Sequence, residues 1–254
     1  MRKLMFLSAA AAAAAAIAAP AHAQHSNGAV VFSTNQTSFT LGSIYKGSTT
    51  INGETYASGN TVDLTTLPLG ATYRPAPLSG NVRWSFYRQP YSVVIGNMEQ
   101  GNNNPASSYW YVRDVVGQNT PLSALPTSGS YTYTGKTLWH DLNREGDFSY
   151  TVNLATRTGS GTITNMQGGS GILAWTGNGT LASAPIALQA DGTVGVKNGS
   201  GTLTTNNPLI NAQWAITGVN PKYDLALYGP NAEEVAGVVK LNAAIGSFGI
   251  AGAR

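Results

Sequence analysis

Apolar and polar residues alternate one by one in several stretches of this chain. The alternation is clearest in residues 130–134, 147–154, 161–166, 193–196 and 213–216. Because successive side chains of a β-strand point to opposite faces of the sheet, this pattern predicts half-buried strands. Runs with the spacing of an amphipathic helix are nearly missing. The pattern therefore predicts an all-β protein.

Short glycine-containing sequences separate these stretches and are typical of tight turns. They are Glu145-Gly146, Gly168-Gly169, Gly177-Asn178-Gly179, Asp191-Gly192 and Asn198-Gly199. Glycine and asparagine adopt the positive φ angles that hairpin turns require. Short strands at hairpin spacing predict an antiparallel meander that closes into a barrel without exposed edges.

A boundary is expected near residues 119–130, which contain two prolines and no alternation. We predict a β-rich domain over residues 24–123 and a barrel domain over residues 124–254. Strand candidates in the first domain are 29–33, 38–45, 82–88, 91–96 and 109–116, with a loop over 68–77. Residues 230–237 are expected to form a turn rather than a helix, because the segment is short.

The first 23 residues have the features of a cleavable secretory signal. Arg2 and Lys3 precede an alanine-rich apolar run, and Ala21-His22-Ala23 is a small-x-small cleavage site before Gln24. Cleavage removes two of the 14 basic residues, so the expected mature chain carries a net charge near neutrality. No basic run remains, and neither a nucleic acid nor an anionic membrane is indicated as a partner.

The chain contains no cysteine, which excludes disulfides and the acylated cysteine of a lipoprotein anchor. The expected mature chain has only two histidines, His25 and His140. A nucleophile elbow with a helix behind it is missing, and Gly135-Lys136-Thr137 lacks the earlier glycine of a phosphate loop. We therefore expect a secreted protein that is not an enzyme and has no membrane anchor.

Aromatic residues and arginines concentrate in the first domain. They are Trp84, Phe86, Tyr87, Tyr91, Tyr109, Trp110 and Tyr111, with Arg74, Arg83, Arg88 and Arg113 nearby. The consecutive residues Tyr109, Trp110 and Tyr111 cannot all face a core, because neighbouring side chains of a strand alternate. We expect exposed aromatic surface beside arginines, a combination found at interfaces and around flat anionic ligands.

The second half resembles the eight-stranded barrel of the transferrin-binding-protein-like family of Gram-negative surface and secreted proteins. The residues that carry the resemblance lie in 129–135, 146–154, 159–163, 228–237 and 246–249, above all the element Gly-Pro-x-Ala-Glu-Glu-x-x-Gly. Residues 86–96 look like a strand of the "handle" domain that precedes such barrels. The resemblance implies an N-terminal β-rich handle followed by a C-terminal eight-stranded antiparallel β-barrel.

Within that family the chain is most similar to secreted hemophilin-type hemophores. This resemblance implies a haem carrier that travels through the periplasm and crosses the outer membrane by a type XI translocon of the surface-lipoprotein-assembly-modulator kind. It also implies delivery of haem to a TonB-dependent receptor, or capture of haem from a host haem protein, with haem held non-covalently in the handle.

Haem iron needs an axial ligand, usually His, Met or Tyr. His140 and His25 are the candidate iron ligands, and Tyr87, Tyr91, Tyr109, Tyr111 and Met98 are alternatives. Arg88 or Arg83 could pair with a haem propionate. Each of these residues also has an ordinary structural explanation, as packing, loop or solvated surface.

Two hypotheses therefore stand at the level of the sequence. The first is a secreted haem-scavenging protein. The second is a secreted host-interaction or colonisation protein that binds a host polypeptide through the aromatic handle without a cofactor.

Overall fold

The computed structural model describes most of the chain after residue 30. The described residues are 31–34, 36–41, 48–51, 54–57, 59–73, 83–101, 104–138, 145–169, 171–216, 218–242 and 246–254. The predicted signal sequence, 1–23, lies outside them. No helix in these segments is long and apolar enough to cross a membrane.

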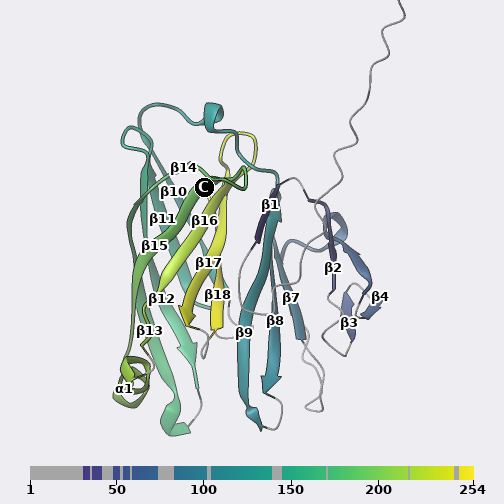
Figure 1. Ribbon diagram of the computed structural model, residues 1–254, viewed down its shortest axis with the longest axis vertical. Helices are drawn as coiled ribbons and strands as arrows, with labels where there is room; N and C mark the ends of the chain where they lie inside the picture. Colours follow the sequence, from purple (N-terminus) through teal and green to yellow (C-terminus); the bar gives the residue numbers. More distant parts are fainter. Residues whose placement is uncertain are drawn as a thin grey trace, which may run out of the picture.

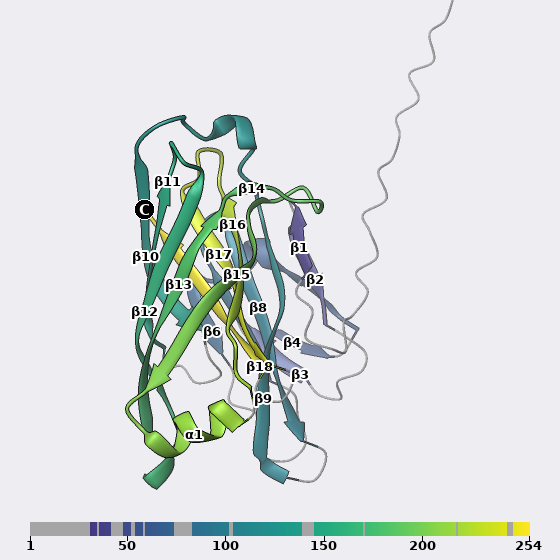
Figure 2. The same ribbon diagram turned by 60° about the vertical axis from the view of Figure 1, so that its left-hand side comes forward.

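Eight antiparallel strands form a closed barrel, as predicted (Figures 1 and 2). They are β10 (Ser130–Leu138), β11 (Asp147–Asn153), β12 (Thr158–Gly168), β13 (Trp175–Pro185), β15 (Val194–Thr205), β16 (Lys222–Tyr228), β17 (Glu234–Asn242) and β18 (Gly246–Ala253). The first and last of these strands pair with each other in the register Thr134↔Ala253 to Leu138↔Gly249. This pairing leaves the barrel without a free edge.

Alternating large side chains fill the barrel. In β11 the buried positions are Phe148, Tyr150 and Val152, and the residues between them face outward. The Tyr150 hydroxyl lies 3.2 Å from that of Tyr223, which donates to the carbonyl of Ala182 at 2.8 Å. A buried tyrosine needs such a partner, because an unpaired hydroxyl in a core is costly. The interior is therefore a packed core.

A second group of strands continues the same sheet beyond the barrel. These strands are β1 (Val31–Thr34), β6 (Gly70–Tyr73), β7 (Arg83–Arg88), β8 (Ser92–Gly101) and β9 (Asn104–Gly117). One parallel bridge, Gly246↔Trp110, joins β9 to β18. The smaller elements beside them are β2 (Ser38–Thr40), β3 (Ser48–Ile51), β4 (Glu54–Ala57), β5 (Thr61–Asp63) and the 3₁₀ turn η1 (Leu64–Thr66). We call these N-terminal elements the handle.

The outer faces of β16, β17 and β18 pack against the handle. Small and branched apolar residues form this contact: Ala226, Ala236, Val238 and Ala251 from the barrel, and Val94, Val112 and Val115 from β8 and β9. Strands buried on both faces have nearly continuous apolar sequences, which explains the run Leu225–Tyr228. We call β16–β18 the covered wall.

The connections between the barrel strands differ from the sequence predictions in places. Residues 213–216, expected to be a strand, lie in the helix α1 (Pro208–Ile216). Asn207 begins this helix, since its side-chain Oδ1 accepts a hydrogen bond from Leu209 N at 3.0 Å, and proline is favoured at the first helical position. An alternation of only four residues is a weaker signal for a strand than the Asn207-Pro208 helix start is for a helix.

Two of the predicted turns lie inside strands. Gly177–Gly179 belong to β13, and Asn198 and Gly199 belong to β15 at a register shift against β16. Asn198 has the positive φ of 55° that its sequence indicated, but the residue forms a β-bulge rather than a turn. The expected loop 68–77 contains the strand β6.

Other connections agree with the sequence. Of the expected turn 230–237, residues 230–233 form a tight turn, whereas 234–237 already belong to β17. Gly168 ends β12, and Gly169 and Asp191-Gly192 lie in hairpin connections. The remaining elements are η2 (Leu122–Ala124), η3 (Gly171–Leu173) and β14 (Ala187–Leu188). The domain boundary drawn between residues 123 and 124 stays a prediction, because the sheet is continuous from β9 to β18.

Candidate functional site

The predicted ligand residues of the handle lie close to its contact with the barrel. Tyr87 and Tyr91 are half-buried and pack against the apolar cluster of the covered wall. Burial raises the pKa of the Tyr87 hydroxyl, and the nearby Glu145 carboxylate adds to this effect. The guanidinium of Arg88 donates to the carbonyl of Leu67. These three side chains therefore serve the packing of the handle.

The Gly-Pro-x-Ala-Glu-Glu element forms the other half of this contact. Glu234, at the start of β17, is almost fully buried and accepts hydrogen bonds from Tyr91 N at 3.0 Å and Ser92 Oγ at 2.8 Å. Gly229 has a φ of +90°, and a Cβ there would lie 2.2 Å from the Glu233 carboxylate. The element is thus a connection between the barrel and the β7–β8 turn.

The environment of Glu234 changes its ionisation. Burial raises the pKa of its carboxyl to about 7, and the hydrogen bonds from Ser92 and Tyr91 oppose this rise. Gln89 Nε2 completes the network by donating to Ser92 Oγ at 2.9 Å and to the carbonyl of Val235 at 3.2 Å. The carboxyl therefore titrates near neutral pH at the joint between the two parts.

A hollow of about 290 Å³ lies beside this joint, between η1 and the ends of β7, β8 and β9. Arg88 and Tyr91, two of the predicted haem-binding residues, both line it. Its volume is at the lower limit for ligand sites, and Arg88 is already bonded to Leu67. Its one conventional iron donor is the half-buried Tyr91. The described residues here fit a haem poorly.

The remaining predicted ligands cannot be placed. His25 and His140 lie outside the described residues. Tyr109 is described only as part of the backbone of β9. Within the described segments, no group of three or more His, Cys, Asp or Glu residues could hold a metal ion.

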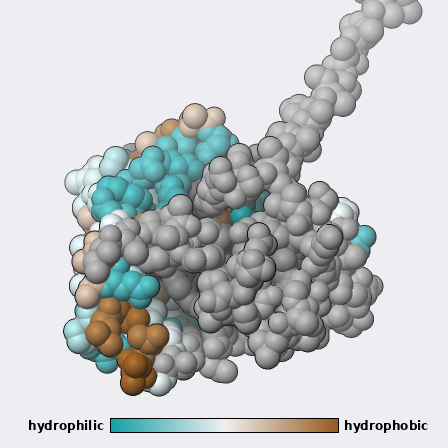
Figure 3. All heavy atoms as spheres, turned by 60° about the horizontal axis from the view of Figure 1, so that its bottom comes forward, coloured by the Kyte–Doolittle hydropathy of each residue, from teal (hydrophilic) through white to brown (hydrophobic). Residues whose placement is uncertain are grey.

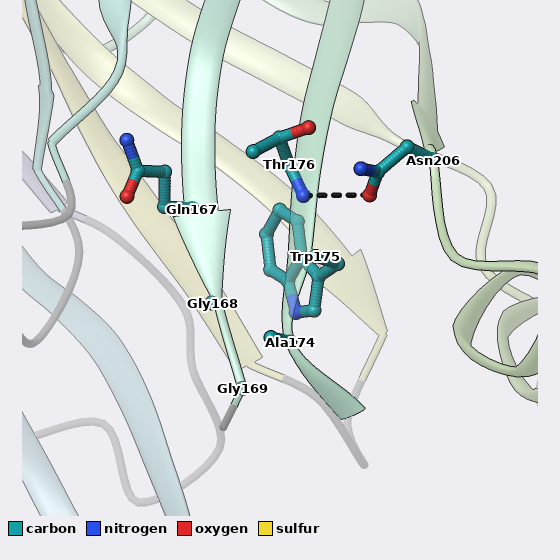
Figure 4. A pocket seen from close by; sticks show the side chains of 7 residues that line it. All are labelled: Gln167, Gly168, Gly169, Ala174, Trp175, Thr176 and Asn206. Atoms are coloured by element: carbon teal, nitrogen blue, oxygen red, sulfur yellow. Dashed lines mark hydrogen bonds between the residues drawn. The ribbon is translucent and has the colours of Figure 1, made fainter. Parts of the chain in front are cut away.

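A second hollow, of about 410 Å³, lies at the far end of the barrel, where β12 ends and β13 begins (Figure 4). Its lining residues are Gln167, Gly168, Gly169, Ala174, Trp175, Thr176 and Asn206. Asn206 Oδ1 accepts a hydrogen bond from Thr176 N at 2.8 Å, as the dashed line shows. The Trp175 ring packs so closely on Gly168 that a Cβ there would lie 2.4 Å from it.

Exposed apolar side chains stand next to this hollow. Ile172 and Leu173 on η3 and Leu209 on α1 have exposed fractions of 84%, 48% and 58%. Figure 3, which brings this end of the molecule forward, shows a hydrophobic patch on an otherwise mostly hydrophilic described surface. We call these three residues the apolar platform.

Sequence reasoning missed the apolar platform. The run Ile172-Leu-Ala-Trp175, which follows Gly168-Gly-Ser-Gly171, predicts a strand in which alternate side chains would be buried. Instead η3 turns outward and β13 begins at Trp175. A signal was nevertheless present, because residues 158–190 and 198–221 contain no charged residue or histidine. Such long uncharged segments on a surface are unusual, since surfaces normally carry mixed charges.

A comparison with protein families matched residues 123–239 to the family described as "Factor H binding protein, C-terminal". The match covers a little less than half of the chain and coincides with most of the barrel. It supports the predicted transferrin-binding-protein-like barrel fold. A comparison with curated proteins gave no match.

Comparison with solved structures found several similar chains. Transferrin-binding protein B from serogroup B Neisseria meningitidis is 15% identical with a TM-score of 0.44, over 77% of this chain and 37% of that one. A double mutant of the Haemophilus parasuis Hp5 protein is 16% identical with a TM-score of 0.42, over 77% and 39%. A structure described as a surface lipoprotein is 16% identical with a TM-score of 0.39, over 85% and 95%.

This chain spans about two fifths of the length of these two transferrin-binding proteins. Identities of this size say nothing about shared partners.

Proposed function

We propose that this chain is an exported protein of the bacterial surface or the extracellular space that binds a host polypeptide on its outer surface. The observation that carries the proposal is the filled barrel. Tyr133, Tyr150, Tyr223, Phe148 and Phe248 occupy its interior as one apolar cluster. A barrel of this kind holds no small molecule inside, so recognition has to use its outer faces.

The family match supports the same function. The description of the family that matches residues 123–239 names the binding of factor H. A rigid sheet with few charges also suits protein recognition, because little conformational entropy is lost when such a surface binds. The predicted signal sequence agrees with a location outside the cytoplasm.

Serum and mucosal proteins passed over the immobilised protein would test the proposal. We expect at least one host protein to be retained. After purification it should bind saturably, with a dissociation constant below about 1 µM, as specific protein complexes do. The same protein immobilised after unfolding is the control. Failure of every retained protein to saturate the folded sample would contradict the proposal.

Haem transport is a second candidate. It rests on the resemblance to hemophilin-type hemophores and requires a site other than the hollow lined by Arg88 and Tyr91, which fits a haem poorly. Export by a type XI translocon and delivery to an outer-membrane receptor belong to this candidate. Titration with hemin should then give a sharpened Soret band at one equivalent, and loss of that band in His140→Ala or His25→Ala would identify the ligand. A spectrum identical to free hemin would reject haem transport.

A further inference from the structure

The apolar platform is held rigidly in place. Asn207 Nδ2 donates to the carbonyls of Ile172 and Ala174, both at 3.0 Å, while its Oδ1 caps α1 at Leu209 N. One side chain therefore joins η3 to the first turn of the helix. The three apolar side chains project from a fixed backbone rather than from a frayed loop.

A second asparagine ties the N-terminal half of the helix to the end of β15. Asn211 Oδ1 accepts a hydrogen bond from Thr205 N at 2.9 Å, and its Nδ2 donates to Thr205 O at 2.7 Å. Behind the helix, the rings of Trp214 and Trp175 meet edge to face with centroids 5.5 Å apart. Because these contacts order the backbone in advance, a partner would lose little conformational entropy by binding here.

The hollow and the platform form one continuous feature of the surface. Ala174 lines the hollow and directly follows Leu173, and Asn206 lines it and directly precedes the helix cap. Gly169 has a φ of +65°, and a Cβ there would lie 1.8 Å from the carbonyl oxygen of Leu173. Because Gly169 has no side chain, this edge of the hollow stays open to a partner. Its 410 Å³ exceed what one aromatic side chain occupies.

The chemistry of the surroundings selects the kind of partner. No charged residue occurs in 158–190 or 198–221, which include both strands of the β12–β13 hairpin and the whole of α1. A neutral surface gives no electrostatic attraction to an acidic or basic partner, and it would desolvate the charges of such a partner without pairing them. An uncharged apolar segment has neither disadvantage.

The size of the platform argues against a stable dimer of this chain. Three partly exposed side chains offer apolar surface on the order of 300 Å², which is near the lower limit for functional patches. A stable interface buries about 800 Å² on each partner. A membrane surface is also disfavoured, since the two segments contain no cationic residue that would attract anionic lipids.

We propose that the platform and its hollow bind a short uncharged apolar segment of a partner polypeptide. One aromatic or aliphatic side chain enters the hollow beside Trp175, and its neighbours contact Ile172, Leu173 and Leu209. The proposal deepens the proposed function, on which it rests, by assigning the host polypeptide a docking site at the far end of the barrel.

A blocked peptide with phenylalanine between two leucines is a suitable probe, because it carries no charge and adds no tryptophan fluorescence. We expect it to change the tryptophan emission of the protein saturably and to shift the amide NMR signals of Gly168 and Gly169. Replacement of its phenylalanine by aspartate should abolish binding. Absence of both signals at millimolar peptide would overturn the proposal.

The variant Ile172→Ser/Leu209→Ser should weaken peptide binding at least tenfold. Leu188→Ser is the matched control, since Leu188 has an exposed fraction of 59% against 58% for Leu209 and lies on β14, away from α1 (Figure 1). It should retain wild-type affinity. Both variants should melt at the wild-type temperature, because the substituted side chains are exposed. An equal loss in the control would overturn the assignment of the site.

Two further measurements separate this proposal from its alternatives. If the protein binds phosphatidylcholine vesicles more tightly than it binds the peptide, the platform is a membrane-binding site instead. If the protein forms a dimer at high concentration and the double variant does not, the platform binds a second copy of this chain instead. If a host protein binds the double variant with unchanged affinity, the docking site is wrong and the proposed function stands. If the peptide binds and no host protein does, the site stands and the proposed function fails.

Discussion

Two walls of the barrel share one inward pattern and differ on their outer faces. In the covered wall, β16–β18, the outward residues that meet the handle are Ala226, Ala236, Val238 and Ala251. In β12 and β13 the outward positions are exposed and mostly polar, among them Thr162, Thr176 and Thr180. We call β12 and β13 the open wall. Small apolar residues let the handle strands approach the barrel closely, whereas outward threonines leave the face of a strand hydrated.

The same difference decides how each wall satisfies its polar groups. In the covered wall Asp224 pairs with Lys240 at 2.8 Å, and Glu234 is buried against the handle. In the open wall the hydroxyl of Thr180 lies 2.8 Å from that of Thr202 on the neighbouring strand β15. Buried polar groups require specific partners, but exposed ones can exchange partners with water. Substitutions should therefore be costly in one wall and mild in the other.

The largest effect is expected for Val238→Asp, which places a carboxylate in the apolar contact between β17 and the handle. An unpaired buried charge should lower the free energy of unfolding by about 3–5 kcal/mol, measured by urea denaturation. Thr180→Asp, on the open wall, should lower it by about 1 kcal/mol at most, because aspartate is disfavoured in strands. Similar values for the two variants would show that the handle does not cover this wall.

A smaller effect is expected for Asn207→Ala at the end of the open wall. Loss of the helix cap and of the bonds to Ile172 and Ala174 should cost about 1–2 kcal/mol and speed amide exchange at Leu209. Asn207→Asp keeps the capping oxygen and removes the two donated bonds, so it should lose roughly half as much. Unchanged exchange at Leu209 in both variants would contradict the rigid platform.

The joint at Glu234 should make stability depend on pH. Its pKa is raised to about 7 in the folded protein, so its contribution to stability is full below its unfolded pKa and is lost as the pH rises through about 7. Glu234→Gln mimics the neutral carboxyl and does not titrate. Between pH 5 and 8 the wild type should lose about 2–3 kcal/mol relative to this variant in parallel denaturation curves.

If the difference in the free energy of unfolding between the wild type and Glu234→Gln is the same at pH 5 and pH 8, the pKa of Glu234 is not raised. Asp147, on β11, is a suitable control, because its hydrogen bonds with Lys136 and Asn165 lower its pKa. Asp147→Asn should therefore leave the loss of stability between pH 5 and 8 unchanged.

The smallest effect is expected for Thr180→Val, which breaks the hydroxyl pair with Thr202 on the open wall. Valine favours strands as much as threonine does, and water replaces the lost partner. The free energy of unfolding should change by less than about 0.5 kcal/mol in urea titrations. A loss of more than about 1 kcal/mol in the free energy of unfolding would mean that the hydrogen bond between the two threonines stabilises the fold and that water does not replace it.

The sequence predicted the barrel because its local signals agree with the fold. Alternation at Phe148, Tyr150 and Val152 marked a strand whose inward residues are now seen in the core. Asn198 correctly indicated a positive φ. The same local chemistry serves a hairpin turn and a β-bulge, however, and only the register against β16 distinguishes them. The positions at which strands end therefore could not be predicted from turn-forming residues alone.

The candidate site was harder to predict, because its features depend on long-range contacts. Tyr87 and Tyr91 were alternative haem ligands with packing as their ordinary explanation, and both are half-buried at the covered wall. The helix α1 had a readable start in Asn207 and Pro208, which a cap-based search would have found. The exposure of Ile172 follows from how η3 and α1 meet; the uncharged segment 158–190 marks an unusual surface but does not single out this residue.

Closure of the barrel also affects when the chain can fold. The strands β10 and β18 are neighbours in space, yet more than a hundred residues separate them along the chain, so their pairing closes a very long loop. No part of the chain made before β18 can complete the barrel. We therefore expect folding to wait until the last strand is available, which would keep the chain in an export-competent state while it is being synthesised.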